Sequence, residues 1–310
     1  MKAKIVTAYW MDVNGYPFQG SANIRKDRYL GSLKSHCENL GLPVICYTHE
    51  LSLHEVEKLK NDFNLDNLEI KLLELKDVKY HNEICQIRDA NFDQNLDGRG
   101  TEIMWGKFDI LERELDDCDR LYWVDCGLQH PGIFPWRYSG KYNKVEDHNN
   151  LTARWWEDYD VHNFKPIFNE KIFEKLNTIC EDKITLLTSI NPQISYRFKS
   201  EGLIDYDVRT PFPVGGLIGG DTKILKKYVQ HYWEFAKKVL DKNKFLCTEE
   251  AIMKIALDNM DENEIVAFKF SAFWSGEHDQ YHFEMWTSES NNPKPLYMVW
   301  YDILNYNDGQ

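Results

Sequence analysis

The first 75 residues alternate between apolar runs and helical stripes of apolar residues. The runs at 4–10, 44–47 and 68–75 are rich in β-forming residues and predict buried strands. Between them, apolar residues recur three or four positions apart and predict two helices, with Tyr29, Leu30, Leu33, Cys37 and Leu40 on the first and Leu53, Val56, Leu59 and Phe63 on the second. This alternation predicts an α/β fold with a mostly parallel, doubly wound sheet.

Local signals indicate where these helices begin and end. Gly41 and Pro43 follow the first helix in the order that usually ends one. Ser52 and Glu55 have the spacing of a capping box, in which the serine accepts from a free backbone amide and the glutamate reaches back. We therefore expect the second helix to begin at Ser52.

The apolar run at 120–124 leads directly into an acid, Asp125. Apolar residues over 104–115 predict the helix that precedes this strand. In sheets of this kind, ligands bind at the carboxyl ends of the strands, where the loops diverge. Asp125 could there contact a divalent ion on a diphosphate, or a ribose hydroxyl. The alternative is an aspartate that caps its own loop. Gly127 favours close approach of a ligand.

The second half of the chain is less regular. Residues 134–164 mix aromatic and polar groups without a clear period. Beyond them the sequence predicts helices over 170–181, over 222–240 and from residue 248, and strands over 184–190 and 265–270. Asp221 is a suitable N-cap for the helix that follows it. We expect two halves, 1–132 and 133–310, merged into one domain.

Two groups in this half are candidates for a site. The stretch PVGGLIGGD (213–221) predicts a strand that lies close to a neighbour, which is either a sugar ring or a packed helix. Glu249 and Glu250 open a helix, where acids stabilise the helix dipole. One of them could also position an acceptor hydroxyl or take its proton.

Three basic residues are candidates for a phosphate contact. Arg25 and Arg28 lie one turn apart on the helix after the first strand, and Lys107 lies on the helix before Asp125. Guanidinium and ammonium groups suit that contact. Each of them alone is more typical of a solvated surface charge.

Histidines near the C-terminus are candidates for a metal contact. His278 and His282 have the i, i+4 spacing of a metal pair, but Gly276 argues against a helix there. A single histidine that completes a metal shell with Asp125 is an alternative. Histidines with this spacing are more commonly ordinary core or surface residues.

Composition narrows the classes of function. The 310 residues carry a formal net charge of −13, which argues against general affinity for nucleic acid. The seven cysteines are scattered without a C-x-x-C pair, so neither a disulfide framework nor a zinc knuckle is indicated. No run approaches the roughly 20 apolar residues of a membrane span, and the N-terminus does not read as a signal peptide. We therefore expect a cytoplasmic protein, which can be peripheral at a membrane.

In their order along the chain, these pieces resemble the GT-A class of nucleotide-sugar glycosyltransferases. The matching pieces are KIVTAYW, the early helix with two arginines, Trp105-Gly106-Lys107, LYWVDCG, VGGLIGGD and TEEAIM, which together span about residues 3–260. The chain is similar to the HtrL/YibB-like branch, linked to bacterial surface polysaccharide. The resemblance implies a GT-A-like (Rossmann-like) three-layer α/β/α fold. It also implies transfer of a sugar from a nucleoside-diphosphate sugar to a glycan or lipid-linked acceptor.

The resemblance further implies a role for each candidate residue. Residues 1–132 would bind the donor and residues 133–310 the acceptor. The implied contacts are Thr7, Ala8 and Tyr9 with the base and ribose, Lys107 with the nucleotide or its phosphates, Asp125 with a divalent metal (Mn²⁺ or Mg²⁺) on the diphosphate, Gly216 with the donor sugar, and Glu249 or Glu250 with the acceptor.

One position departs from the pattern of the class. The D-x-D motif reads Asp125-Cys126-Gly127, so its second acid, usually a direct metal ligand, is missing. Either a histidine such as His130 or His278 completes the metal shell, or basic groups neutralise the diphosphate instead.

Two other functions stay open. One is a carbohydrate-binding protein without catalysis. The other is a sugar nucleotidyltransferase, which the sequence MDVNGYPF after the first strand disfavours because it has one glycine and no basic residue.

Overall fold

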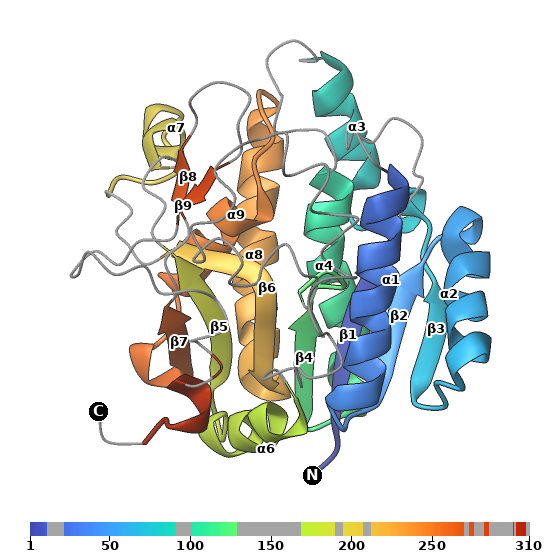
Figure 1. Cartoon of the computed structure of the whole chain (residues 1–310). Coiled ribbons are helices and arrows are strands. Elements are labelled where there is room, and N and C mark those ends of the chain that lie inside the picture. Colours follow the sequence, from blue (N-terminus) through green and yellow to red (C-terminus); the bar gives the residue numbers. More distant parts are fainter. Residues whose placement is uncertain are drawn as a thin grey trace.

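A seven-stranded sheet forms the centre of the protein (Figure 1). The computed structural model describes residues 1–10, 22–90, 101–128, 169–189, 195–206, 212–269, 273–275, 282–284, 300 and 302–307. The strands of the sheet are β1 (Ala3–Tyr9), β2 (Val44–Thr48), β3 (Leu68–Leu72), β4 (Arg120–Val124), β5 (Ile184–Ser189), β6 (Phe212–Asp221) and β7 (Ile265–Lys269). Two short strands, β8 (Phe273–Ser275) and β9 (His282–Glu284), pair separately.

Helices connect the strands and cover both faces of the sheet (Figure 1). They are α1 (Ala22–Asn39), α2 (Glu50–Phe63), α3 (His81–Ala90), α4 (Thr101–Glu114), α6 (Glu170–Ile179), α7 (Ser195–Ser200), α8 (Thr222–Lys242) and α9 (Glu249–Leu257), with short 3₁₀ turns η1 (Leu75–Asp77), η3 (Leu115–Asp117) and η6 (Glu262–Glu264). In the part of the chain that the structure describes, no helix has both the length and the apolar character of a membrane span.

The strand order confirms the predicted three-layer α/β/α fold. The order is β3-β2-β1-β4-β6-β5-β7, and every neighbouring pair is parallel except the two that involve β6. The chain runs outward from β1 to β3 and then returns to place β4 on the other side of β1. This reversal makes the carboxyl ends of β1 and β4 a topological switch point, where sheets of this kind bind ligands.

Alternating side chains on each strand feed two separate hydrophobic cores. On β4, Leu121 and Trp123 join the core under α4, α8 and α9, whereas Tyr122 and Val124 join the core under α1, α2 and α6. All four side chains are at most 4% exposed. A strand buried on both faces has to be apolar throughout, which explains the sequence of this strand.

Strand β6 bulges in its middle. Leu186 and Leu187 of β5 pair with Ile218 and Val214, so the three β6 residues between those partners are left out of the β5 ladder. At its other end, β6 lies so close to its neighbours that a side chain on Gly220, which has φ +136°, would meet the Lys183 carbonyl at 2.4 Å. At Gly219 the close neighbour is strand β4, where a side chain would meet the Leu121 carbonyl at 2.2 Å.

The helix boundaries confirm some capping predictions and correct one. The Asp221 side chain accepts from the amides of Lys223 and Ile224, as expected for the N-cap of α8. The capping box at Ser52 is wrong. Helix α2 begins at Glu50 after N-cap residue His49, and the Ser52 hydroxyl lies 3.0 Å from the His49 ring inside the first turn.

Helix α4 is anchored at its C-terminal end by a buried carboxylate. Glu114 is 1% exposed and accepts hydrogen bonds from Lys4 at 2.7 Å, from Tyr47 at 2.6 Å and from Lys71 at 2.6 Å. Burial alone would raise the pKa of Glu114, but these three donors lower it overall. Glu114 therefore joins α4 to β1, β2 and β3.

Candidate functional site

Three charged side chains from different elements meet at the carboxyl end of β4. The Lys107 ammonium, on α4, lies 2.8 Å from Glu249 Oε1 at the start of α9 and 3.7 Å from Asp125 Oδ1. Lys107 and Glu249 are 4% and 8% exposed, whereas the Asp125 side chain is 44% exposed. Asp125 is thus the accessible member of a buried ionic cluster at the switch point of the sheet.

Trp123 orients the Asp125 carboxylate. The two residues point to the same face because they are two apart on an extended chain. The indole nitrogen of Trp123 donates to Asp125 Oδ1 at 2.8 Å, and the Lys107 ammonium lies 5.6 Å from the ring centre. The sequence indicated Trp123 only as a core residue. Its position two residues before Asp125 on a strand was the signal that could have placed the two side chains on the same face.

Electrostatics hold this cluster in its ionised arrangement. Burial lowers the pKa of Lys107, but Asp125 and Glu249 more than offset that effect, so its pKa rises overall. Burial raises the pKa of Asp125, and Lys107 and Trp123 reduce that rise. Because Asp125 still meets solvent over 44% of its side chain, its desolvation is partial. Lys107 therefore stays charged and fixes both acids.

Gly215, in the bulge of β6, provides backbone contacts for the same cluster. Its carbonyl accepts from the Lys107 ammonium at 3.2 Å, and its backbone also hydrogen-bonds the Glu250 carboxyl. A side chain on Gly215 would come within 2.1 Å of the Lys107 nitrogen and 2.9 Å of Glu249 Oε1. The glycine stretch was predicted to allow a close approach, and at Gly215 the group that approaches is a lysine.

Glu250 is the acid of the cluster with the most altered proton affinity. Burial, followed by the charge of Glu249, raises the pKa of Glu250 to about 8, against the opposing effect of Lys107. The site therefore holds a proton close to neutral pH.

We expect Glu250→Gln to remove a pH dependence of stability. In the folded state the raised pKa keeps a proton on Glu250 up to about pH 8, whereas the unfolded chain loses it near pH 4.5. The free energy of unfolding should therefore fall as pH rises through that window, by at most about 1.4 kcal/mol per pH unit. Urea unfolding across the window measures it. Wild type and the exposed control Glu57→Gln should share the slope, and an unchanged slope in Glu250→Gln would contradict the assignment.

The proposed nucleotide-contacting residues of β1 lie beside this cluster. Val6 pairs with Trp123, so residues 7–9 run alongside the end of β4. Ala8 is partly exposed and packs on the same core as Trp123. Thr7 is fully buried, and the Tyr9 hydroxyl donates to Glu55 on α2 at 2.8 Å. Their contact with a base and ribose remains a prediction.

The structure describes the remaining predicted residues only in part. Gly216 is buried on β6, where a side chain would meet Leu128 at 3.0 Å. Arg25 and Arg28 are on the first turns of α1, but their side chains are outside the described residues. His130 and His278 also lie outside the described residues.

The described residues around Asp125 do not make a metal site on their own. Asp125 Oδ1 already accepts from Trp123 and faces the Lys107 ammonium. Within the described ranges, one group of three acidic, histidine or cysteine side chains lies close enough to share an ion, and Asp125 is not in it. No catalytic step is therefore assigned to a metal, and a divalent ion at Asp125 stays a prediction.

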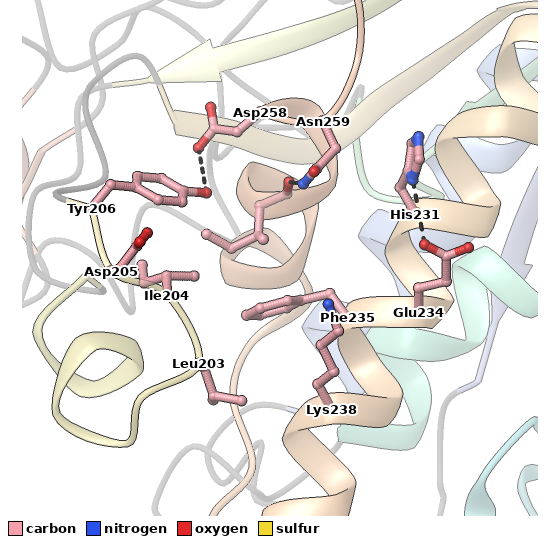
Figure 2. A pocket seen from close by; sticks show the side chains of 11 residues that line it. Leu203, Ile204, Asp205, Tyr206, His231, Glu234, Phe235, Lys238, Asp258 and Asn259 are labelled. Carbon is pink, nitrogen blue, oxygen red and sulfur yellow. Dashed lines mark hydrogen bonds and ion pairs between the residues drawn. The ribbon is translucent and has the colours of Figure 1, made fainter.

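A hollow lies at the opposite end of α9 from Glu249. It has a volume of about 440 Å³ between α8, α9 and residues 203–206 (Figure 2). Two of the acids on its wall are engaged: Tyr206 donates to Asp258 at 3.2 Å, and Glu234 lies 3.5 Å from His231. None of the residues of the ionic cluster lines it.

Comparisons with known proteins give distant structural likenesses. No family model and no curated protein sequence matches the chain. Mouse xyloside xylosyltransferase 1 aligns with a TM-score of 0.44 and 10% identity, covering 86% of this chain and 85% of that one. Core-mannan synthase A from Aspergillus fumigatus, in its Mn/GDP form, gives 0.45 and 8%, covering 86% and 73%. The 4-diphosphocytidyl-2C-methyl-D-erythritol synthase of Anaerococcus prevotii gives 0.37 and 8%, covering 86% and 86%. At such TM-scores these likenesses carry no argument about activity.

Proposed function

We propose that this chain transfers a sugar from a nucleoside-diphosphate sugar to a glycan or lipid-linked acceptor. The observation that carries the proposal is the meeting of Lys107, Asp125 and the Glu249–Glu250 pair at the switch point between β1 and β4. Ligands of open α/β sheets bind at that place. The resemblance of the sequence to the GT-A class supports the same function. Surface polysaccharide or glycan biosynthesis, and the HtrL/YibB-like branch, are part of this proposal.

Asp125 is proposed as the donor-site carboxylate. Its Oδ1 is fixed by Trp123 and Lys107, which leaves Oδ2 for a ribose hydroxyl or for an ion on the diphosphate. Lys107 acts as a positioning residue, because its ammonium already contacts Gly215, Glu249 and Asp125. Charge that develops on the departing diphosphate must be neutralised. We assign that role to Arg25 and Arg28.

Glu250 is proposed as the group that accepts the proton of the acceptor hydroxyl. Glu249 is held in an ion pair with Lys107, whereas the raised pKa of Glu250 lies near the operating range of a general base. In this step the acceptor oxygen bonds to the anomeric carbon of the donor, the bond from that carbon to the phosphate oxygen breaks, and the nucleoside diphosphate leaves. The hydroxyl proton passes to Glu250 in its ionised form, which becomes populated as the pH approaches the raised pKa of about 8.

Thermal melting with nucleoside diphosphates should test the donor site. A nucleotide that binds the native state raises the melting temperature by mass action, by an amount equivalent to about 2.7 kcal/mol at 100 times its Kd. We expect one nucleoside diphosphate to stabilise the wild type and the exposed control Asp62→Asn, but not Asp125→Asn. Parallel scans with manganese decide whether Asp125 Oδ2 contacts a divalent ion or a ribose hydroxyl.

The same scans separate the alternatives. A stabilisation that needs manganese and disappears in Asp125→Asn supports an ion at Asp125. A stabilisation that is independent of manganese supports neutralisation of the diphosphate by Arg25 and Arg28 without an ion. If no nucleoside diphosphate stabilises the wild type, the transferase is overturned in favour of a carbohydrate-binding protein.

A further inference from the structure

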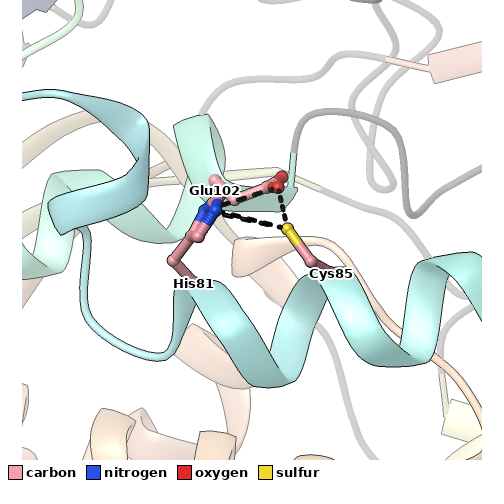
Figure 3. A group of neighbouring side chains, drawn as sticks. All are labelled: His81, Cys85 and Glu102. Carbon is pink, nitrogen blue, oxygen red and sulfur yellow. Dashed lines mark hydrogen bonds and ion pairs between the residues drawn. The ribbon is translucent and has the colours of Figure 1, made fainter.

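A second group of side chains converges between α3 and α4, away from the ionic cluster. His81 and Cys85 lie one turn apart on α3, and Glu102 reaches them from the first turn of α4 (Figure 3). Cys85 Sγ lies 3.8 Å from His81 Nδ1 and 3.5 Å from Glu102 Oε1, and the last edge of the triangle, from Nδ1 to Oε1, is 3.9 Å. A nitrogen, a sulfur and an oxygen thus lie within 4 Å of one another, and the other His81 ring nitrogen, Nε2, lies 3.5 Å from the sulfur.

These separations match those of ligands on one tetrahedral ion. Zinc binds sulfur at about 2.3 Å and nitrogen or oxygen at about 2.0–2.2 Å, which sets tetrahedral ligands about 3.4–3.6 Å apart. The observed edges exceed these by at most a few tenths of an ångström, which side-chain rotation can close. Cysteine, histidine and carboxylate are also the ligand types that zinc takes.

In the absence of an ion, a guanidinium provides the positive charge at this point. Arg88 donates to Glu102 Oε1 at 2.5 Å and to Cys85 Sγ at 3.0 Å. Glu102 is 3% exposed, so its charge requires a partner in the fold. The Arg88 side chain is 28% exposed and can turn towards solvent. The ligands are therefore held together by a cation that an ion can replace.

We propose that His81, Cys85 and Glu102 bind a divalent transition-metal ion, zinc by their chemistry, in exchange for the Arg88 guanidinium. The ion takes three protein ligands and leaves a fourth position for water or another ligand. On binding, the Cys85 thiol gives its proton to solvent and coordinates as the thiolate. This site is separate from any ion at Asp125 and does not depend on the proposed sugar transfer.

The backbone at the start of α3 is built to present His81. Tyr80, directly before it, has φ +64°, a conformation that a bulky residue rarely adopts. Its ring packs edge-to-face on Trp233 at 5.6 Å, and the Lys79 ammonium lies 5.9 Å from the centre of the Tyr80 ring. An unfavourable conformation kept in place by packing is typical of a functional position.

Metal titration of the reduced, metal-free chain tests the site. Zinc is titrated against a chromophoric chelator, and Co²⁺ serves as a probe because its absorption reports thiolate ligation. We expect one zinc ion per chain, with affinity lowered at least about 10-fold by Cys85→Ser and by His81→Ala. Arg88→Gln should raise the affinity, because it removes the competing cation. Cys118→Ser, at a cysteine that donates to the Glu114 carbonyl at the far end of α4, is the matched control and should change nothing.

The outcomes are distinct from those for the donor site. Asp125→Asn should leave the zinc affinity unchanged, since Asp125 is not in this group. The proposal is overturned if Co²⁺ gives no thiolate absorption, or if that absorption survives Cys85→Ser. If Cys85→Ser does not fold, Arg88→Gln decides, because an affinity that is not raised would show that the guanidinium does not compete with the ion.

Discussion

Lys107→Met should lower the free energy of unfolding by about 3–5 kcal/mol, the cost of leaving buried charges without their partner. Methionine keeps the unbranched shape of the side chain but removes the ammonium that lies 2.8 Å from Glu249 and 3.7 Å from Asp125. Glu249 is 8% exposed, so water cannot replace the lost charge. Urea unfolding measures the loss.

Two further variants show whether the loss comes from unpaired charge. Lys58→Met removes one member of the exposed pair with Asp62 and should cost at most about 0.5 kcal/mol. In the double variant Lys107→Met/Glu249→Gln the buried carboxylate is gone as well, so much of the stability should return. A loss below about 1 kcal/mol for Lys107→Met alone would show that the cluster is not held by its charges.

Gly215→Ala should disrupt the same cluster by shape alone. The added methyl group would lie 2.1 Å from the Lys107 nitrogen and 2.9 Å from Glu249 Oε1, so the ends of both side chains have to shift from their present contact. Gly215 has no positive φ, so alanine meets no backbone strain there. We expect a loss of about 1–3 kcal/mol in the free energy of unfolding. We also expect a smaller nucleotide-dependent rise in melting temperature, because Asp125 loses its contact with Lys107 and keeps only the hydrogen bond from Trp123.

Gly216→Ala is the matched control one residue further along β6. Its methyl group would meet only the ends of Leu128, at 3.0 Å, and Leu187, at 3.6 Å, both of which can rotate. Stability should change by less than about 1 kcal/mol, and the response to a nucleoside diphosphate should remain. If both alanine variants lost stability equally, the loss would come from a general disturbance of strand β6. The contact between Gly215 and Lys107 would then not be its cause.

The fold could be predicted from the sequence because burial imposes a pattern on each element. Strand β4 is apolar throughout because both of its faces are covered, and the stripe of Leu33, Cys37 and Leu40 reflects one buried face of α1. The reversed direction of β6 could not be predicted, since an apolar strand reads alike in either direction. The start of α2 was misplaced because Ser52 and Glu55 match a capping pattern, although the helix begins two residues earlier, after N-cap residue His49.

The site could be predicted only in part. Lys107, Asp125, Glu249 and Glu250 were candidates for separate local reasons, and the structure brings the first three into contact. Which of these side chains contact one another could not be predicted, because Lys107 and Glu249 are 142 positions apart in the sequence. For the same reason the group around Cys85 was missed: residues 76–102 have no clear period, and Glu102 joins it from another helix.

Helix α4 is fixed at both of its ends. Glu114 ties its C-terminal end to three strands, and Glu102 ties its N-terminal end to Arg88 on α3. Lys107 lies between these anchors, so it is a stationary reference point. Among the described residues, the start of α9 and the bulge of β6 are the parts of the cluster that a substrate-driven rearrangement would move. Opening and closing of this site would consist of glutamates moving past a lysine that stays in place.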